Sequence, residues 1–195
     1  QAIMCYAGGD TANRVLPHLD FELIKKNSKI FIGYSDISTI TTAITSMTGL
    51  VTFHGPNAYY GPLLKNYTHD IFLKLLSESR PFGLIPPKTP WKVLKKGEAT
   101  GRLMGGNLTI ILNLISSDRL SLQKSLNAWK GAIFFWEEVE EEPKVIDRML
   151  MHYKLAGIFN ELSGMVIGKL NRVRETDPDF KKTSFTVDEI VQDLT

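Results

Sequence analysis

Short apolar runs alternate with amphipathic stretches along the 195 residues of this chain. Brief runs rich in β-branched residues are typical of buried strands, and apolar side chains that repeat at i and i+4 indicate helices. A strand, helix, strand order of this kind favours parallel sheets joined by crossovers, and so an α/β fold. We predict strands over residues 2–6, 30–32, 50–53, 91–95, 132–136 and 165–167, and helices over residues 21–27, 38–48, 68–77, 107–114, 144–156 and 187–194.

A change in composition divides the chain near its middle. Residues 80–91 contain four prolines and one glycine, a density that regular structure does not accommodate. We interpret residues 80–96 as a linker between an N-terminal domain over 1–79 and a C-terminal domain over 97–195, which begins with a glycine-rich turn region over 97–106. The chain begins on a predicted strand without a methionine and ends in a predicted helix, so we expect both domains to be incomplete.

Composition and charge exclude several classes of function. Hydrophobic residues make up 43% of the chain and charged residues 23%, which is typical of a soluble globular protein with a substantial core. The formal net charge of +2 implies no polyanionic partner, so we expect no nucleic acid to bind. No apolar run approaches the roughly 20 residues of a membrane-spanning helix. The single cysteine, Cys5, excludes an internal disulfide and suits a reducing compartment.

The corner after the second predicted strand is the first candidate for chemistry, because Ser35 lies between that strand and a predicted helix. Open α/β sheets bind ligands at the carboxyl ends of their strands, and the first N–H groups of a helix favour developing negative charge. These features are those of a nucleophile elbow, although Ile37 stands where the second glycine of that motif would be. Ser35 could instead be a helix N-cap, with Asp36 in the first turn. The glycine pair Gly8-Gly9 could equally bring the backbone close to a ligand or form a tight turn.

A serine nucleophile needs a base, an orienting carboxylate and donors for the oxyanion. Glu137 directly follows the apolar run over 133–136, at a strand end where α/β proteins concentrate catalytic groups, although it could instead begin a solvated acidic run. That run lacks nearby histidines and the spacing of a calcium loop, so we predict no metal site. His54 closes a strand at the same end of the predicted sheet, so it is either a base or a residue that fixes its loop. The other histidines are more typical of surface or capping positions: His18, His69 and His152.

Seven stretches, taken in order, share their sequences with one protein family. They are GGDTANRVLPHLD at 8–20, KIFIGYSDI at 29–37, TFHGP at 52–56, GRLMGGNL at 101–108, IFFWEEV at 133–139, IDRML at 146–150 and GMVIGK at 164–169. Together they resemble the LD-carboxypeptidases of the serine-peptidase class, a family that includes the microcin C immunity peptidases. The resemblance covers nearly the whole chain, which makes it far more specific than any one motif.

This resemblance implies a Rossmann-like N-terminal domain that carries the nucleophile and a smaller, β-rich α/β domain that carries the other members of a Ser-Glu-His triad. By position, Ser35 is the nucleophile and Glu137 is the acid that orients the histidine. The backbone N–H groups of Gly9 and Asp36 then form the oxyanion hole. The family uses no metal or organic cofactor. Possible substrate-binding residues are Gly8, Asn107 and Asn171.

The resemblance also has consequences for the histidines and shows two departures. The family's base histidine lies beyond the equivalent of Thr195, which leaves His54 as a conformational residue of its loop. Ala7 stands where the family often has arginine or a β-branched residue. Asn171 stands where the microcin-immunity branch tends to carry an acidic residue, which disfavours amine recognition of the microcin type. The stretch over 146–150 is more similar to the cell-wall enzymes.

The function that this resemblance implies is hydrolysis of the amide between an L-centre and a terminal D-amino acid. The substrate would be a muropeptide tetrapeptide that loses its last D-alanine during peptidoglycan recycling in the bacterial cytoplasm, and the enzyme would be a homodimer. One alternative is an immunity peptidase of the microcin C type, which cleaves a peptidyl or aminoacyl nucleotide. An alternative of another class is a muropeptide-binding protein that has lost catalysis.

Overall fold

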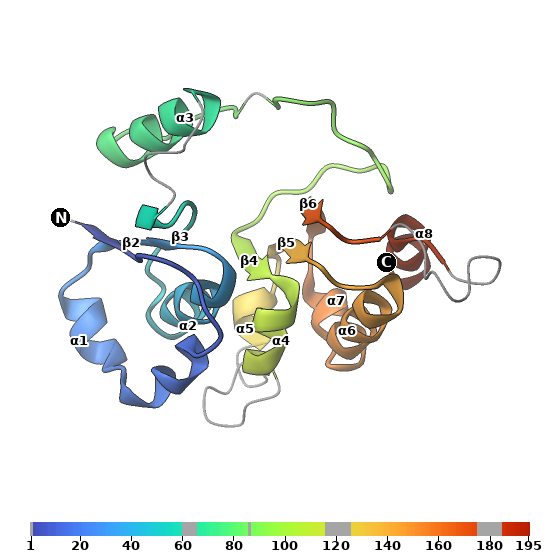
Figure 1. The fold of residues 1–195 in the computed structure, drawn as a ribbon, viewed down its shortest axis with the longest axis horizontal. Helices are drawn as coiled ribbons and strands as arrows, with labels where there is room; N and C mark the ends of the chain where they lie inside the picture. Colours follow the sequence, from blue (N-terminus) through green and yellow to red (C-terminus); the bar gives the residue numbers. More distant parts are fainter. Residues whose placement is uncertain (1, 60–65, 86, 116–125, 175–184) are drawn as a thin grey trace.

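The computed structural model describes residues 2–59, 66–85, 87–115, 126–174 and 185–195. Within these residues the chain forms two three-stranded sheets in which every strand pair is parallel (Figure 1). The α/β fold with parallel sheets is therefore confirmed. The first sheet has the order β1 (Ala2–Met4), β2 (Ile30–Gly33), β3 (Phe53–His54), and the second has the order β4 (Leu103–Asn107), β5 (Ile133–Val139), β6 (Gly164–Asn171).

Helices lie over both faces of the first sheet. Figure 1 shows α1 (Phe21–Lys26) and α2 (Ser38–Thr48) on one side and α3 (Asn66–Ser77) on the other. The Asp20 side chain caps α1 by accepting a hydrogen bond from the Leu23 N–H at 2.9 Å. Gly49 ends α2 in the left-handed conformation, with φ 75°, which glycine adopts without a steric cost. The three predicted helices are confirmed.

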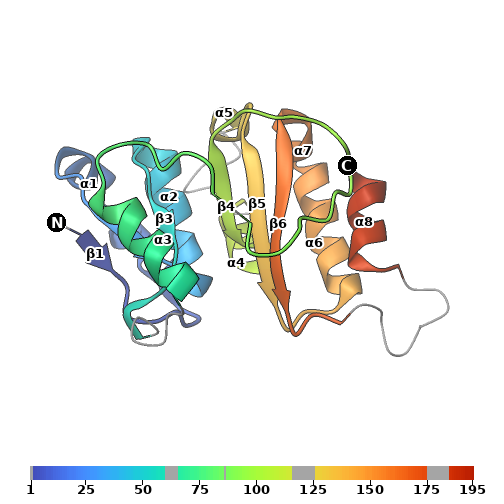
Figure 2. The same cartoon turned by 90° about the horizontal axis from the view of Figure 1, so that it is seen from above.

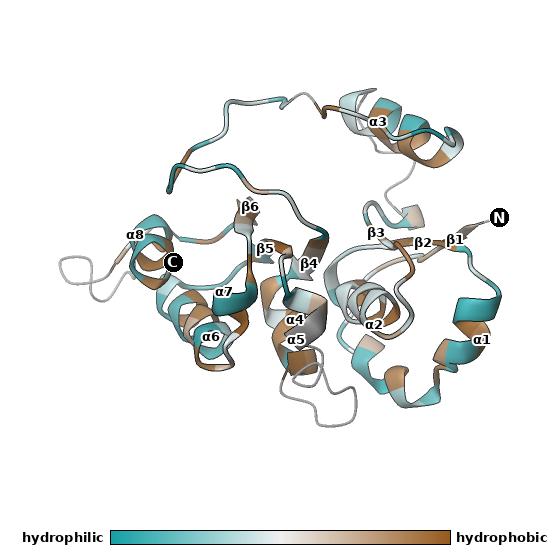
Figure 3. Cartoon of the chain, turned by 180° about the vertical axis from the view of Figure 1, so that it is seen from behind, coloured by the Kyte–Doolittle hydropathy of each residue, from teal (hydrophilic) through white to brown (hydrophobic). Residues whose placement is uncertain are grey.

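The larger hydrophobic core lies on one face of the second sheet, against α4 (Leu108–Ile115), α6 (Pro143–Leu155) and α8 (Val187–Leu194). Figure 2 shows α8 alongside α6, and the short helices α5 (Leu126–Trp129) and α7 (Ile158–Glu161) near one end of the sheet. The Phe134 ring packs against Trp129 and Tyr153, with centroid distances of 5.4 and 5.1 Å. Hydrophobic and hydrophilic positions alternate around the helices, as expected where one face is buried (Figure 3).

Strand β4 replaces the turn region that we predicted over residues 97–106. Its two glycines, Gly105 and Gly106, have φ values of 153° and 151°. A Cβ atom on Gly105 would lie 1.6 Å from the Phe135 carbonyl oxygen, and one on Gly106 would lie 2.7 Å from Ser38 Oγ. Glycine is required here because neighbouring chains approach closely, so interpreting these glycines as turn residues was wrong.

The strand predicted over residues 91–95 is also wrong. These residues are irregular. They contact α8, where the Gln192 side-chain amide donates to the Leu94 carbonyl oxygen at 3.2 Å. A β-branched and aromatic run forms a strand only where it can join a ladder, and none reaches it within the described residues. The described part of residues 80–96 contains no helix or strand, as the prolines indicated. The division into two domains remains a prediction.

Helices α2 and α4 join the two sheets. Leu114 of α4 packs with Leu16 and Ala43, and the Thr42 hydroxyl donates to the Gly105 carbonyl oxygen at 3.4 Å. This packing brings the carboxyl ends of β2, β3, β4 and β5 into one region of the molecule, where parallel sheets place their ligands. In the described part of the chain, every helix is too short or too polar to cross a membrane.

Candidate active site

Ser35 has a backbone conformation that residues other than glycine rarely adopt. It begins a short 3-10 turn (Ser35–Ile37) directly after β2, with φ 65°. This left-handed conformation costs a non-glycine residue on the order of 1 kcal/mol and is concentrated at functional sites. The residues that precede the turn and α2 are Tyr34 and Ile37, and neither helix start has a side-chain cap. The N-cap interpretation of Ser35 is therefore wrong, and the elbow interpretation agrees with its geometry.

The glycine pair after β1 lies against this elbow. A Cβ atom on Gly8 would lie 3.0 Å from Ser35 Cβ and 3.1 Å from Ser35 Oγ. Gly9 has φ 149°, and a Cβ atom there would lie 3.6 Å from Asp36 Oδ2. The backbone of Gly8 therefore lies so close to Ser35 that a side chain at position 8 would crowd the serine. The oxyanion role of the Gly9 and Asp36 N–H groups remains a prediction.

The Asp36 side chain has a structural role that the sequence did not reveal. Asp36 is 5% exposed, and its carboxylate accepts hydrogen bonds from the backbone N–H groups of Thr11 and Ala12, both at 2.8 Å. Those donors open the short helix that follows the glycine pair, at Ala12–Arg14. Asp36 thus ties the segment after β1 to the elbow after β2. No local signal could reveal this, because the partners are more than 20 residues apart.

The alternation of β5 separates two neighbouring glutamates. Glu137 lies inside the strand, paired with Asn107 of β4, rather than directly after it as predicted. Its side chain points away from the face that carries Phe134, Trp136 and Glu138, because successive strand residues face opposite sides. The register of β6 shifts between Trp136 and Glu138, and such irregularities re-aim side chains next to active sites.

Glu138 is buried and holds the start of α4. Its carboxylate accepts hydrogen bonds from the Asn107 side-chain amide at 3.0 Å, the Thr109 N–H at 2.9 Å and the Thr109 hydroxyl at 2.7 Å. The Asn107 amide oxygen in turn accepts from the Ile110 N–H at 3.1 Å. A buried carboxylate is tolerated where it is bonded this completely. The acidic run that Glu137 begins is therefore not solvated along its whole length, because Glu138 is buried.

Ser38, His54, Asn107 and Glu137 meet where the two sheets approach each other. Ser38 Oγ accepts a hydrogen bond from the Asn107 N–H at 3.0 Å and lies 3.5 Å from His54 Nδ1. His54 Nε2 lies 3.8 Å from Glu137 Oε1. The sequence singled out three of these residues but missed Ser38, which resembles the other hydroxyl residues of α2.

Burial decides the charge states in this cluster. It lowers the pKa of His54 to about 4, so the imidazole is neutral near pH 7. Burial also raises the pKa of Glu137, the Glu138 charge raises it further, and a hydrogen bond from Asn107 acts in the opposite direction. The contact between His54 and Glu137 is therefore one between a neutral ring and a carboxyl group, rather than an ion pair.

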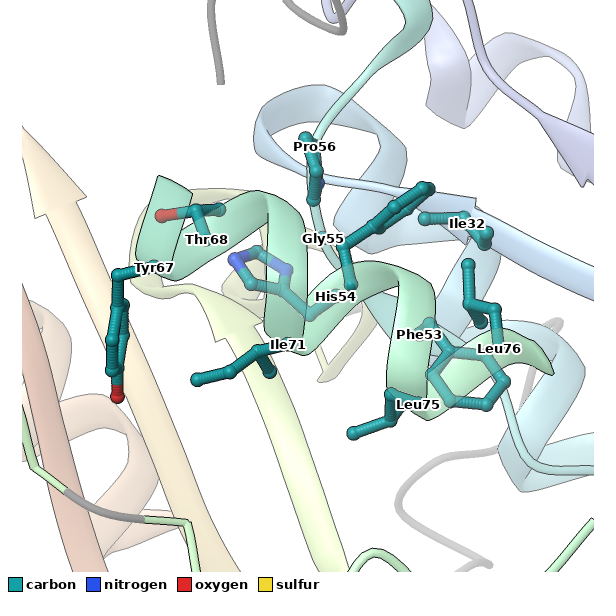
Figure 4. A pocket seen from close by; sticks show the side chains of 11 residues that line it. Ile32, Phe53, His54, Gly55, Pro56, Tyr67, Thr68, Ile71, Leu75 and Leu76 are labelled. Atoms are coloured by element: carbon teal, nitrogen blue, oxygen red, sulfur yellow. The ribbon is translucent and has the colours of Figure 1, made fainter. Parts of the chain in front are cut away.

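An apolar cavity of about 240 Å³ opens beside His54. Figure 4 shows the His54 ring within it, with Ile71 and Leu75 on the side of α3. Its wall is mostly apolar, with polar groups from His54, Tyr67 and Thr68. The lining residues are Ile32, Phe53, His54, Gly55, Pro56, Tyr67, Thr68, Ile71, Phe72, Leu75 and Leu76.

The remaining candidates lie outside the cluster. Asn171 is exposed at the end of β6, where its carbonyl oxygen accepts the Glu140 N–H at 2.9 Å, and no described contact connects it with Ser35. Its role in substrate binding remains a prediction. His18, His69 and His152 are exposed, which agrees with the surface positions expected for them.

Acidification is expected to destabilise the fold through His54. The pKa of this histidine is about 4 when folded and 6.5 ordinarily, so between those values the unfolded chain binds the extra proton. Its contribution to the free energy of unfolding is complete above pH 6.5 and is lost as pH falls toward 4. The loss is about 2 kcal/mol at pH 5. Glu137 acts oppositely, because its raised pKa adds stability that is lost as pH rises.

Urea unfolding of the wild type and of His54→Gln at pH 7.5 and pH 5 isolates the histidine, because Glu137 is present in both proteins. We expect the wild type to lose about 2 kcal/mol more than the variant on acidification. An equal loss in the two proteins would show that the burial of His54 is not the cause.

Comparison with known proteins identifies the family. A family model described as the LD-carboxypeptidase N-terminal domain matches residues 1–55, and one described as the LD-carboxypeptidase C-terminal domain matches residues 100–195. The chain belongs to the LD-carboxypeptidase family. The resemblance found in the sequence is therefore confirmed.

Two curated relatives show how far the match extends. The chain is 32% identical over 196 residues to a probable murein peptide carboxypeptidase of Bacillus subtilis (strain 168), covering 99% of this chain and 58% of the relative. It is also 32% identical over 196 residues to the microcin C7 self-immunity protein MccF of Escherichia coli, covering 86% of this chain and 55% of that protein. The chain thus spans less than two thirds of the length of these members of the LD-carboxypeptidase family.

Solved structures agree with the fold. The MccF-like protein of Bacillus anthracis str. Ames has a TM-score of 0.79 at 28% identity, over 98% of this chain and 62% of that one. MccF in complex with glutamyl sulfamoyl guanosine has a TM-score of 0.74 at 25% identity, over 99% and 63%. A muramoyltetrapeptide carboxypeptidase from Oxalobacter formigenes, at 23% identity and a TM-score of 0.78, shares the fold.

Proposed function

We infer that this chain carries the nucleophile and the orienting acid of a serine carboxypeptidase that releases the terminal D-amino acid of cell-wall muropeptides. The observation that carries this proposal is Ser35, held at φ 65° after β2 and against the backbone of Gly8. A strained serine at a strand end presents its hydroxyl to a substrate. Membership of the LD-carboxypeptidase family and the similarity to a probable murein peptide carboxypeptidase support the reaction and the substrate class.

In the proposed reaction, Ser35 Oγ attacks the carbonyl carbon of the last amide bond, and its proton passes to a base histidine that Glu137 orients. The N–H groups of Gly9 and Asp36 stabilise the oxyanion. The tetrahedral intermediate then collapses, the C–N bond breaks, and the histidine gives its proton to the leaving amine of D-alanine. Water hydrolyses the remaining acyl ester and regenerates Ser35. This sequence of steps requires no metal or organic cofactor.

His54 is a poor candidate for the base. Its ring contacts Ser38 and Glu137, and no contact among the described residues links it to Ser35. Its pKa of about 4 also lies well below the range of an efficient base near neutral pH. We therefore propose that the base is the family histidine, which the resemblance places after the equivalent of Thr195.

Hydrolysis of an aminoacyl nucleotide is the second candidate function. Structures of MccF contain glutamyl sulfamoyl guanosine and aspartyl sulfamoyl adenosine, and the Escherichia coli MccF is 32% identical to this chain. The same nucleophile and oxyanion donors would serve this reaction, because both substrates pass through a tetrahedral intermediate. A bacterial cytoplasmic location and a homodimer belong to either proposal as family expectations.

The test is product analysis with the protein produced from its complete gene. We expect D-alanine release from muramoyl tetrapeptide, and no release of alanine from the matched tetrapeptide that ends in L-alanine. Faster hydrolysis of aspartyl sulfamoyl adenosine than of the tetrapeptide would favour the second candidate. Binding of the tetrapeptide without turnover of any of these substrates would contradict both and leave a non-catalytic binding protein.

A further inference from the structure

The imidazole of His54 lies between two polar groups that come from different parts of the fold. Its Nδ1 is 3.5 Å from Ser38 Oγ in the first turn of α2, and its Nε2 is 3.8 Å from Glu137 Oε1 in β5. Tyr34 and Phe135 flank the ring at steep angles, with centroid distances of 6.3 and 5.5 Å. The ring therefore presents one nitrogen to each polar group.

The hydrogen-bond requirements of Ser38 decide the tautomer of His54. Ser38 is fully buried, and its Oγ already accepts the Asn107 N–H at 3.0 Å. Its hydroxyl proton therefore needs an acceptor, and among the described residues the remaining neighbour is His54 Nδ1. An accepting Nδ1 in a neutral imidazole places the ring proton on Nε2, facing Glu137.

Glu137 provides an acceptor that lacks a donor. Its Oε1 is buried and has no hydrogen-bond partner among the described residues. A buried carboxylate oxygen without a donor is costly, so a nearby N–H group stabilises it strongly. The Nε2–H of His54 is about 1 Å beyond hydrogen-bond distance, a gap of the kind that closes when an active site binds its substrate.

Two glycines leave room for these groups. A Cβ atom on Gly106 would lie 2.7 Å from Ser38 Oγ and 3.3 Å from His54 Nδ1. A Cβ atom on Gly168 would lie 3.1 Å from Glu137 Cβ. Side chains at either position would separate the polar groups, so the backbone on both sides is shaped around them.

We propose that His54 is a positioning residue, with Ser38 setting its tautomer and its Nε2–H holding Glu137 Oε1; this rests on the proposed function, in which Glu137 orients the base. In this proposal, hydrogen bonds run from the Asn107 N–H to Ser38 and from the Ser38 hydroxyl to His54, and a third forms from His54 to Glu137 when the 3.8 Å gap closes. They connect α2, which begins three residues after Ser35, with the strand that carries the acid.

The ionisable groups around His54 leave its proposed hydrogen bonds unchanged near pH 7. Glu137 and Tyr34 face the ring directly, Tyr67 of α3 lines the cavity beside it, and Glu138 acts on it through Glu137. Burial keeps the imidazole neutral, so the hydrogen bonds retain one arrangement across the neutral range.

Two amide substitutions distinguish positioning from simple packing. A glutamine amide at position 54 reaches the place of Nε2 and can donate to Glu137, whereas an asparagine amide reaches only the place of Nδ1. We expect His54→Asn to lower kcat about 10- to 100-fold with KM within about threefold, and His54→Gln to restore kcat to within about fivefold. His69→Asn, on an exposed histidine, is the control and should retain wild-type kinetics. Equal kcat values for the two position-54 variants would overturn the proposal.

Nuclear magnetic resonance gives a readout that does not depend on turnover. In the wild type at pH 7, the ¹⁵N signals of His54 should show a protonated Nε2 and an unprotonated Nδ1. The pKa of Glu137, followed by ¹³C labelling, should rise in His54→Asn, because the carboxylate loses a donor, and should stay near the wild-type value in His54→Gln. The opposite tautomer in the wild type refutes the proposal even if both variants fail to fold. Absence of D-alanine release with the expected tautomer and pKa change refutes the proposed function while the contact with Glu137 stands.

Discussion

Alanine in place of Ser35 is expected to lower kcat/KM for D-alanine release by about 10³-fold or more. The substitution removes the atom that forms the acyl-enzyme, and the residual rate comes from the oxyanion donors and from substrate binding. Ser35 has φ 65° in the folded chain, and alanine meets the same steric cost there because it also carries a Cβ atom. The free energy of unfolding should therefore change by less than about 0.5 kcal/mol.

The measurement is steady-state release of D-alanine together with urea unfolding of each protein. Ser28→Ala is the matched control, because Ser28 is an exposed serine before the same strand. It should retain wild-type kinetics and stability. Wild-type turnover in Ser35→Ala would remove Ser35 from the reaction, whereas a large loss of stability would mean that the lost turnover reports unfolding.

The largest effect on stability is expected for Gly105→Ala. The new Cβ atom would lie 1.6 Å from the Phe135 carbonyl oxygen and 3.0 Å from the Phe135 nitrogen, both of them backbone atoms of β5. Neither atom can rotate away, so β4 and β5 must separate, with loss of the pairing that runs from Leu103 to Asn107. We expect a loss of about 4 kcal/mol or more in the free energy of unfolding, which is exceptional for a single substitution.

Alanine substitutions at two other glycines separate the cost of the backbone conformation from the cost of the steric overlap. Gly157 has φ 80° and Gly97 has no unusual φ, and a Cβ atom on either would meet nothing within 4 Å. Gly157→Ala should cost about 1 kcal/mol for its left-handed conformation, and Gly97→Ala should cost almost nothing. Urea unfolding of the three variants tests the series. A loss in Gly105→Ala no larger than in Gly157→Ala would contradict the close approach of β4 and β5.

Much of this architecture could be predicted from local patterns. The strand before Ser35, the helix after it and the glycine that ends that helix follow from side-chain periodicity and from the conformational freedom of glycine. Ser35 could be singled out as a candidate as well, because a serine between a buried strand and a helix is either a nucleophile or a helix N-cap. Local sequence could not decide whether Ser35 is a nucleophile or a helix N-cap. That distinction depends on the φ angle of Ser35 and on the backbone of Gly8 beside it.

The different roles of neighbouring residues follow from the way the strands and helices pack. Glu137 and Glu138 are identical side chains in one acidic run. Because successive residues of β5 point to opposite faces of the sheet, Glu137 lies near His54 and Glu138 lies near Thr109 at the start of α4. The glycines of β4 signalled a turn, but the reason for them is close packing: Gly105 lies against the Phe135 backbone of β5, and Gly106 lies against Ser38 of α2, which is distant in the sequence.

The α/β class, the family and the serine at the centre of the proposed site could all be predicted without a structure, because they depend on periodicity and on motifs within short segments. The structure alone decided that Asp36 binds the segment after β1, that Ser38 contacts His54, and that Glu137 faces the same histidine. Each of those contacts joins residues that are distant in the chain. Their geometry is set by strand register and helix packing, which no local pattern of residues records.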